Sequence, residues 1–308
     1  MKLEQYLERR CALIDRTLKQ LLSDHEAPPK NLGKAMHYSL FSRGKRIRPI
    51  LALASGEAVG ARPQPILPFA CALEMIHSYS LVHDDLPAMD DDDLRRGKPT
   101  NHVVFGEAMA ILAGDGLLTE AFRIMAQAAL KRGRDRTVAL QAIWEVASGA
   151  GMAGMVGGQV ADIEAEHQKP TRKRVEYIHT RKTGALLRAS VRVGARVGGA
   201  SAKQYACLDR YGTAVGLAFQ VTDDILDIEG GMAKTGKRVG RDAELNKATY
   251  PAALGMKKTK RYARELLDEA LTALQPFSSK AEPLRQIARF VVERAVPSTA
   301  LRTGPSET

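Results

Sequence analysis

The sequence predicts an all-α protein built as one large helical bundle. Apolar residues recur with helical spacing towards the C-terminus, and alternating strand patterns are hard to find. The chain is also long enough, at 308 residues with 44% hydrophobic content, to bury a substantial core. The helical repeats are Tyr262-Ala263, Leu266-Leu267, Ala270-Leu271 and Leu274, then Leu284, Ile287-Ala288 and Val291-Val292.

The order of elements indicates one domain over residues 1–296, followed by a polar tail over residues 297–308 that we expect to be frayed. Residues 137–148 and 219–227 each read as helix, and the linkers are short. A Gly- and Lys-rich stretch, 229–249, directly follows the second of these helices. We interpret it as a lid over a binding site and not as a domain boundary.

Two aspartate clusters stand in apolar, helix-like surroundings. They comprise Asp84, Asp85 and Asp90, and Asp223, Asp224 and Asp227. Carboxylates crowded into a segment that buries apolar surface repel one another unless a cation neutralises them, and a hard divalent ion with oxygen ligands does so directly. A single cluster is typical of a solvated helix end, but two such clusters favour a metal site.

The two clusters are expected to present their carboxylates in different ways. The second lies in the run 219–227, which reads as one helix, so its first and last aspartates share a face and the middle one lies beside the last. In the first cluster Asp90 follows Asp84 by six positions, which a regular helix would carry off that face. Pro87 is expected to end the helix and let the chain fold Asp90 back.

Three basic motifs accompany the aspartates. They are Gly44-Lys45-Arg46-Ile47-Arg48-Pro49, Arg95-Arg96-Gly97-Lys98 and His179-Thr180-Arg181-Lys182-Thr183-Gly184. Arg offers a planar fork to phosphate oxygens, and Lys offers a point charge. Each motif alone is typical of surface charge. Together with six carboxylates, the motifs predict a polyanionic ligand, such as a diphosphate, held both through metal and by the cations directly.

The run 76–102 and several shorter motifs closely resemble the short-chain trans-prenyltransferases, the polyprenyl synthetases. The resemblance covers nearly the whole chain, and it implies an isoprenoid-synthase-type bundle around a central diphosphate and prenyl pocket. The shorter motifs are Gly44 to Pro49, Gly157-Gly158-Gln159 with Asp162, Lys182-Thr183-Gly184, Phe219-Gln220 with the second aspartate cluster, and Lys237 with Lys247-Ala-Thr-Tyr-Pro251.

The resemblance implies a role for each motif residue. Asp84, Asp85, Asp90, Asp223, Asp224 and Asp227 would bind three magnesium ions that hold an allylic diphosphate. Arg95, Lys182 and Lys237 would contact that diphosphate. Gly44, Lys45, Arg48, His77 and Arg96 would form the site for isopentenyl diphosphate. Thr183 and Gln220 would face the developing allylic cation, and Lys247 would lie in a closing loop. Arg95, Lys182, Thr183 and Gln220 are the expected catalytic residues.

The implied reaction joins isopentenyl diphosphate to dimethylallyl or geranyl diphosphate and yields farnesyl diphosphate, with fifteen carbons. Magnesium and the cationic side chains would stabilise the departing diphosphate as the allylic bond ionises. The double bond of isopentenyl diphosphate would then attack the cation, and proton loss would follow. Because water would quench that cation, the pocket has to be dry, which polar motifs among apolar helices would allow.

Tyr79 and the adjacent Ser80 are the candidates for control of product length. Tyr79 precedes Asp84 by five positions, so a helix would place it roughly 7–8 Å deeper along the axis. In similar enzymes a bulky residue there blocks the growing chain near fifteen carbons. The alternative is that Tyr79 only packs in the core and does not set the product length. A twenty-carbon geranylgeranyl product and a non-catalytic partner subunit are the alternative functions.

Composition argues against other partners. The net charge of +11 raises the question of nucleic acid, but the basic motifs already have a diphosphate to bind, and aromatic content is only 5%. The glycines of 149–154 match a dinucleotide fingerprint formally, yet a helix and not a strand precedes them, so we expect them to let helices approach closely.

The spacing of the cysteines and the length of the apolar runs indicate the cellular compartment. Cys11, Cys71 and Cys207 have no metal-site or disulfide spacing, which predicts a reducing, cytoplasmic location. No apolar run approaches the length of about 18 residues that a membrane span needs. A homodimer is implied by the family resemblance alone.

Overall fold

Helices α3 and α4 are apolar on all sides, and they form the interior of the bundle. The structure is a computed structural model that describes residues 2–23, 29–42, 44–131, 136–166, 168–229 and 247–297. Within these ranges the all-α prediction is confirmed, with one short hairpin added. A helix that is apolar all round has to be surrounded by others, and α4 packs against α1, α2, α3, α6, α7 and α10.

The elements follow one another with short connections. The helices are α1 (Leu3–Ser23), α2 (Lys30–Leu40), α3 (Ile47–Ala58), α4 (Leu67–Asp84), α5 (Asn101–Phe105), α6 (Glu107–Leu130), α7 (Arg136–Ala150), α8 (Met155–Ala165), α9 (Arg172–His179), α10 (Ala185–Val197), α11 (Ala202–Glu229), α14 (Tyr250–Leu254), α15 (Met256–Ala273) and α16 (Glu282–Glu293). A π-helix, η2 (Thr180–Gly184), joins α9 to α10, and a 3₁₀ turn, η3 (Ser279–Ala281), precedes α16.

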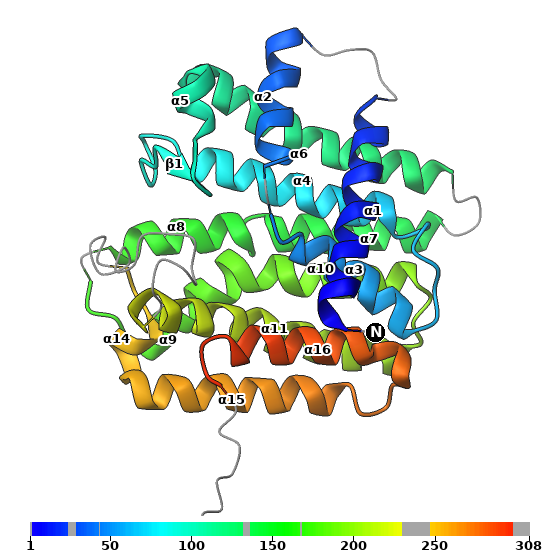
Figure 1. Ribbon diagram of the computed structural model, residues 1–308, viewed down its shortest axis with the longest axis vertical. Helices are drawn as coiled ribbons and strands as arrows, with labels where there is room; N and C mark the ends of the chain where they lie inside the picture. The colour runs from blue at the N-terminus through cyan, green and yellow to red at the C-terminus, as the bar shows by residue number, and fades with distance from the viewer. Residues whose placement is uncertain are drawn as a thin grey trace, which may run out of the picture.

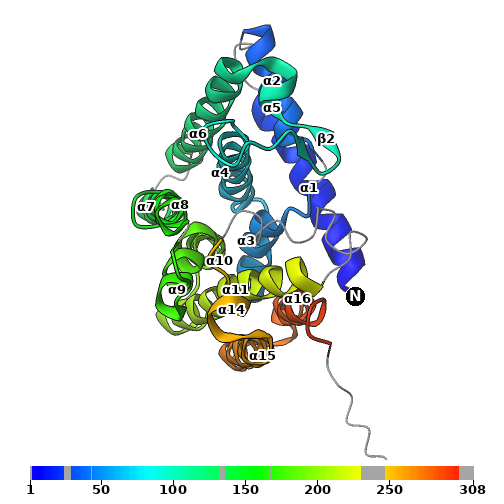
Figure 2. The same ribbon diagram turned by 90° about the vertical axis from the view of Figure 1, so that its left-hand side faces the viewer.

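Most of the helices lie roughly alongside one another, as a stack that runs across the view in Figure 1, while α1 and α2 cross the stack. Figure 2 looks along many of the same axes and shows α6, α7 and α8 at one edge of the molecule. The hairpin, α9 and α14 lie at one end of the stack, on the left in Figure 1. The C-terminal ends of α4 and α11 lie at the same end (Figure 1).

The outer helices bury one face each, as the apolar repeats predicted. α16 buries Leu284, Ile287, Ala288, Val291 and Val292. α15 turns its own apolar stripe towards α11 and α16, with charged residues on the opposite side. None of the helices in the described ranges is both long enough and apolar enough to cross a membrane.

Small residues allow the close helix contacts that we predicted for 149–154. A Cβ atom on Gly149 of α7 would lie 2.9 Å from the Cβ of Ala189 in α10. In the next helix, a Cβ atom on Gly158 of α8 would lie 2.1 Å from the backbone nitrogen of Lys182. Glycine at 158 therefore lets α8 lie directly against η2, which carries the Lys182-Thr183-Gly184 motif.

The hairpin pairs β1 (Leu94–Arg95) with β2 (Lys98–Pro99) in antiparallel register. Its two turn residues, Arg96 and Gly97, both have positive φ, at 55° and 74°. This is the pattern of a type I′ turn, whose twist matches that of the paired strands. Arginine is an unusual residue at such a position, and its left-handed backbone directs Arg96 back towards the bundle.

Candidate active site

The first aspartate cluster forms where α4 ends. α4 stops at Asp84, and Asp85 caps it with backbone bonds to the last turn. The backbone nitrogen of Asp90 then donates to the carbonyl oxygen of Asp84 at 2.9 Å. The chain therefore folds Asp90 back beside Asp84 after Pro87, as the sequence predicted.

Cations surround this cluster. Arg95 of the hairpin donates through Nε to Asp85 Oδ1 at 2.8 Å, and Lys247 Nζ lies 3.5 Å from Asp90 Oδ1. Burial raises the pKa of Asp84 to about 6, and the neighbouring carboxylates of Asp90 and Asp85 add to this effect against Lys182 and Arg95. Asp84 is therefore harder to ionise than an ordinary aspartate, chiefly because it is buried.

Lys182 enters the site from the π-helix. Its Nζ donates to Asp162 Oδ2 of α8 at 2.6 Å. Burial alone would lower the pKa of Lys182, but Asp162, Asp84 and Asp90 outweigh it and raise the pKa above its ordinary value. Lys182 is therefore a fixed cation between α8 and the first cluster. Thr183 follows it in η2, an irregular helical turn of the kind often found at functional sites.

The second cluster lies on α11, which is one continuous helix through Glu229, as predicted. Asp223 is half-buried, and its Oδ1 accepts a hydrogen bond of 2.6 Å from Arg294. Asp227, also half-buried, lies one turn further along the same face. Gln220 lies one turn before Asp223, and α11 packs against η2.

Asp224 faces a different environment from Asp223. It is buried, and its Oδ2 lies 3.0 Å from Nε2 of His179 and accepts a 2.8 Å hydrogen bond from the backbone nitrogen of Tyr250. The segment 247–250 consequently bridges the two clusters, because Lys247 contacts Asp90 at one end and Tyr250 contacts Asp224 at the other.

The basic residues of the N-terminal half form a second set. The pKa of Lys45 is lowered by partial burial and by Arg294 and Arg96, against the opposite effect of Asp223. Arg48 is buried at the start of α3, and burial lowers its pKa to about 10. These interactions place both residues in the electrostatic field of Asp223 and Arg96, between the second cluster and the hairpin.

His77 and Gly44 belong to the same region. Burial and the surrounding arginines, Arg48 and Arg96 foremost, hold the pKa of His77 well below its ordinary value, so the imidazole is neutral at pH 7. Gly44 lies against the Arg96 guanidinium, since a Cβ atom there would come 2.6 Å from Arg96 Nη1. Glycine therefore leaves room for Arg96, whose Nη1 reaches the hydroxyl of Ser42 at 3.4 Å.

Tyr79 lies in α4 as predicted and is only 7% exposed. Its ring packs edge-on against His83, with 5.7 Å between the ring centroids. The hydroxyl of Ser80 donates to the carbonyl oxygen of His77 at 2.9 Å. Tyr79 lies five residues before Asp84 on an unbroken helix, which sets it below the first cluster.

Carboxylate oxygens are the donors that a hard divalent ion prefers, and the chain folds Asp90 back beside Asp84 and Asp85 at the end of α4. The residues thus fit magnesium chemically. Within the described ranges no three His, Cys, Asp or Glu side chains are arranged to hold a metal ion. Instead, Arg95, Lys247 and Arg294 occupy carboxylates of the two clusters.

The structure brings together most of the residues singled out from sequence. The exception is Lys237, which lies outside the described residues together with most of the stretch interpreted as a lid. Sequence reasoning missed Arg294 and Glu74. Arg294 follows α16 without any motif around it, and only the packing of α16 beside α11 brings it to Asp223. Glu74 had a readable signal, because it is a lone carboxylate in the apolar run of α4.

Comparison with known proteins agrees with this geometry. The pattern of the polyprenyl synthetase family matches residues 29–288. The farnesyl diphosphate synthase of Geobacillus stearothermophilus is 49% identical over 96% of this chain and 98% of its own length. The geranylgeranyl diphosphate synthase of Cyanophora paradoxa is 44% identical over 94% of this chain and 95% of its own.

A solved structure has the same fold. The apo structure of an FPP/GFPP synthase from Zymomonas mobilis superposes with a TM-score of 0.83 at 37% identity, covering 94% of this chain and 98% of the other. Similarity of this extent spans both aspartate clusters and all three basic motifs. The chain belongs to the polyprenyl synthetase family.

Proposed function

We propose that this protein is a farnesyl diphosphate synthase, which condenses isopentenyl diphosphate with dimethylallyl or geranyl diphosphate. One observation carries the proposal: two aspartate clusters on α4 and α11 lie at one end of the bundle, linked by segment 247–250 and faced by cations from separate elements. A polyanion that also binds metal matches such a mixed site. The relative from Geobacillus stearothermophilus, which carries this name, supports the same activity.

The allylic diphosphate is assigned to the aspartate side of the site. The proposed magnesium ligands are Asp84, Asp85, Asp90, Asp223, Asp224 and Asp227. Magnesium, when bound, supplies positive charge to the diphosphate oxygens as the allylic carbon–oxygen bond breaks. Lys182 and Arg95 add fixed positive charge at the same leaving group, and Lys247 and Lys237 are assigned to it from the segment that follows α11.

Isopentenyl diphosphate is assigned to the second basic set. Lys45, Arg48 and Arg96 provide cations, and His77 provides a neutral hydrogen-bonding group beside them. Gly44 contributes by leaving room for Arg96. Arginines suit this task because their planar forks bind phosphate oxygens in pairs.

Thr183 and Gln220 are assigned to the allylic cation, which their side-chain oxygens would stabilise. They lie on η2 and α11, two elements that pack together next to Lys182. The apolar interior formed by α3, α4 and α10 would keep water away from that cation. No side chain needs to act as a nucleophile, because the double bond of isopentenyl diphosphate attacks the cation.

A twenty-carbon product is the second candidate, and the relative from Cyanophora paradoxa gives it support. The position of Tyr79 favours fifteen carbons. Its ring is buried below the first cluster and is held by His83, so that a growing chain would meet it. Ser80, the neighbouring residue on α4, is assigned to the same floor.

We further propose a homodimer and a cytoplasmic location. Large apolar side chains are exposed along α6, α7 and α8, the edge seen in Figure 2, and such a surface is typical of a subunit interface. They include Leu140 and Trp144 of α7 and Val160 of α8. Trp144→Glu should therefore yield monomers by size exclusion with light scattering, and an unchanged mass would contradict this interface.

The three free thiols support the proposed cytoplasmic location, because they suit a reducing compartment.

Product analysis tests the enzyme proposal. The purified protein is incubated with isopentenyl diphosphate and either dimethylallyl or geranyl diphosphate, with and without magnesium. The products are identified by mass spectrometry. We expect a magnesium-dependent fifteen-carbon product from the wild type and longer products from Tyr79→Ala. A twenty-carbon wild-type product would refute the role of Tyr79, and the absence of any product with either allylic primer would refute the activity.

A further inference from the structure

Arg46 is the one basic residue of the motif 44–49 that has no place in the proposed diphosphate sites. It is only 5% exposed, whereas the side chain of Lys45, its neighbour, is exposed. The backbone of Arg46 is left-handed, with φ at 49°. A residue with a Cβ atom rarely adopts this conformation, so the surrounding contacts have to hold it.

The guanidinium of Arg46 joins three other helices to the start of α3. Its Nε donates to Asp15 Oδ1 of α1 at 3.0 Å, its Nη1 to Glu74 Oε1 of α4 at 2.8 Å, and its Nη2 to the carbonyl oxygen of Leu40, the last residue of α2, at 2.7 Å. The carbonyl oxygen of Arg46 accepts the backbone bond from Ile50 in the first turn of α3. One side chain therefore ties the start of α3, between Lys45 and Arg48, to α1, α2 and α4.

Glu74 gives these contacts an electrostatic consequence. It is 3% exposed and lines a narrow cavity of about 40 Å³ together with His77, Arg95 and Arg96. Its charge acts on Arg48 and Arg96, both assigned to isopentenyl diphosphate. Within the described part of the chain, its second oxygen, Oε2, is buried without a hydrogen bond, as is Nε of Arg48.

We infer that Arg46 is a positioning residue for the isopentenyl diphosphate site, which orients Lys45 and Arg48 and offsets the negative charge of Glu74. The inference rests on the function proposed above. Without Arg46, Glu74 would be an uncompensated anion behind the cations that receive the substrate. It would compete with the diphosphate for Arg48 and Arg96, and the left-handed turn would lose its support.

The kinetic test compares the two substrates. Arg46→Gln should raise the KM for isopentenyl diphosphate by about tenfold or more, the effect of weakening charged hydrogen bonds to a ligand, and leave the KM for geranyl diphosphate within about threefold. Adding Glu74→Gln to this variant should recover most of the loss, because it removes the uncompensated charge. Arg46→Lys, which keeps the charge, should be affected less than Arg46→Gln.

A matched control separates positioning from general stability. Arg192 of α10 is likewise bound to two carboxylates, but it lies in a network away from the site. Arg192→Gln should lower the melting temperature and leave both KM values unchanged. Equal changes in the two KM values of Arg46→Gln, or no recovery in the double variant, would overturn the inference.

A binding measurement keeps this result independent of the enzyme assignment. Calorimetry of inorganic pyrophosphate without magnesium reports on diphosphate binding by the cations of the site. Arg46→Gln should weaken this binding, and Arg46→Gln/Glu74→Gln should restore it. If the wild type yields no product but pyrophosphate behaves in this way, the proposed function fails and the role of Arg46 stands. If Arg46→Gln binds pyrophosphate as the wild type does, the inference fails.

Discussion

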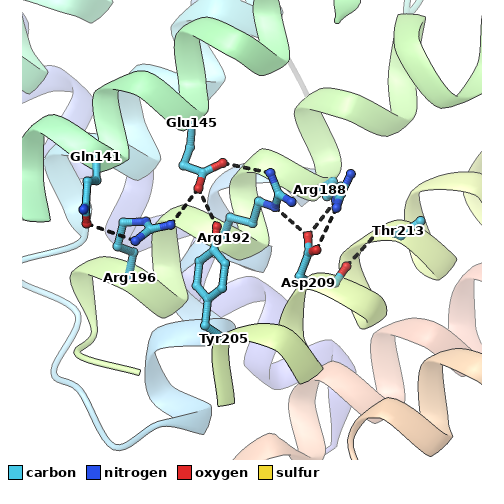
Figure 3. Close-up of polar contacts among 8 residues, drawn as sticks. All are labelled: Gln141, Glu145, Arg188, Arg192, Arg196, Tyr205, Asp209 and Thr213. Carbon is cyan, nitrogen blue, oxygen red and sulfur yellow. Dashed lines mark hydrogen bonds and ion pairs between the residues drawn. The ribbon is translucent and has the colours of Figure 1, made fainter. Parts of the chain in front are cut away.

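Carboxylates lie beside arginines in two regions of this molecule, and the two regions are neutralised to different degrees. Between α7, α10 and α11, Glu145 accepts hydrogen bonds from Arg192 at 3.0 Å, from Arg196 at 2.9 Å and from the hydroxyl of Tyr205 (Figure 3). Asp209 is held by Arg192 and also by Arg188, at 2.6 Å. Each carboxylate in this network has at least two cationic partners.

The pKa values of Asp209 and Asp84 differ between the two regions. Burial would raise the pKa of Asp209, but hydrogen bonds from Arg188 and Arg192 outweigh it and bring the value to about 2. At the aspartate cluster of α4, burial prevails and the pKa of Asp84 is about 6. The same residue types therefore stabilise the fold in one place and leave a charge to be met by a ligand in the other.

The difference has a geometric origin. Arg188, Arg192 and Arg196 are four residues apart on α10, so they form one stripe that faces Glu145 and Asp209 (Figure 3). The cations of the active site come instead from separate elements: the hairpin, the π-helix, the segment after α11 and the residue after α16. The arrangement of the active-site cations therefore depends on how separate segments pack, whereas the stripe on α10 is set by the spacing of one helix.

The largest expected effect is at the under-neutralised carboxylate. Asp84→Ala should lower kcat by about 1,000-fold or more, because it removes a proposed metal ligand, and should leave the fold intact. Steady-state turnover and circular dichroism measure the two properties. Near-normal turnover with intact helical content would show that Asp84 is not a metal ligand. It would also contradict the contrast drawn between the two regions.

The converse effect is expected at Glu145. Glu145→Ala should lower the free energy of unfolding by about 1–3 kcal/mol, because Arg192, Arg196 and Tyr205 lose the buried carboxylate that accepts their hydrogen bonds. Turnover per folded molecule should stay at the wild-type level. Urea unfolding measures the free energy, and kinetics normalised to the number of folded molecules measure turnover. A loss below about 1 kcal/mol would mean that the network is not the stabilising region that its geometry indicates.

The smallest expected effect is on the stability provided by Asp209 and on how that stability depends on pH. Asp209→Asn should lower the free energy of unfolding by about 1–2 kcal/mol at pH 7. The folded-state pKa of Asp209 is depressed to about 2, so its contribution is complete above the unfolded value of about 3.9 and is lost as the pH falls through the folded value.

The gap in unfolding free energy between the wild type and Asp209→Asn should therefore shrink as the pH is lowered from about 4 to about 2. Urea unfolding at a series of pH values follows it. Thr213→Val, which changes a hydroxyl bonded to the carbonyl oxygen of Asp209, provides the control with a gap independent of pH. A gap that grows towards acid pH would show that the arginines do not hold Asp209 ionised.

Local pattern was sufficient for several parts of the site. The helix through Asp227, the end of α4 before Pro87 and the return of Asp90 all follow from short-range rules, and the structure has each of them. The i, i+4 arginine stripe on α10 was equally readable in the sequence. These features depend on residues within a few turns of one another, where spacing alone fixes the geometry.

Other features depend on contacts between distant segments. No local signal indicates that Arg294 meets Asp223, that Asp224 turns to His179 and Tyr250, or that Arg46 points inward to Glu74 while Lys45 points outward. Arg294 is 71 residues from Asp223, Tyr250 is 26 residues from Asp224, and Glu74 is 28 residues from Arg46.

The amino-acid sequence by itself determined the helical class, the two aspartate clusters and the basic motifs, because these rest on periodicity and local spacing. The same motifs carried the resemblance to the family. Tertiary structure alone decided which cation meets which carboxylate. That choice depends on how α3, α4, α11 and α16 pack, since burial and the separation of charges set every pKa and every ion pair in the site.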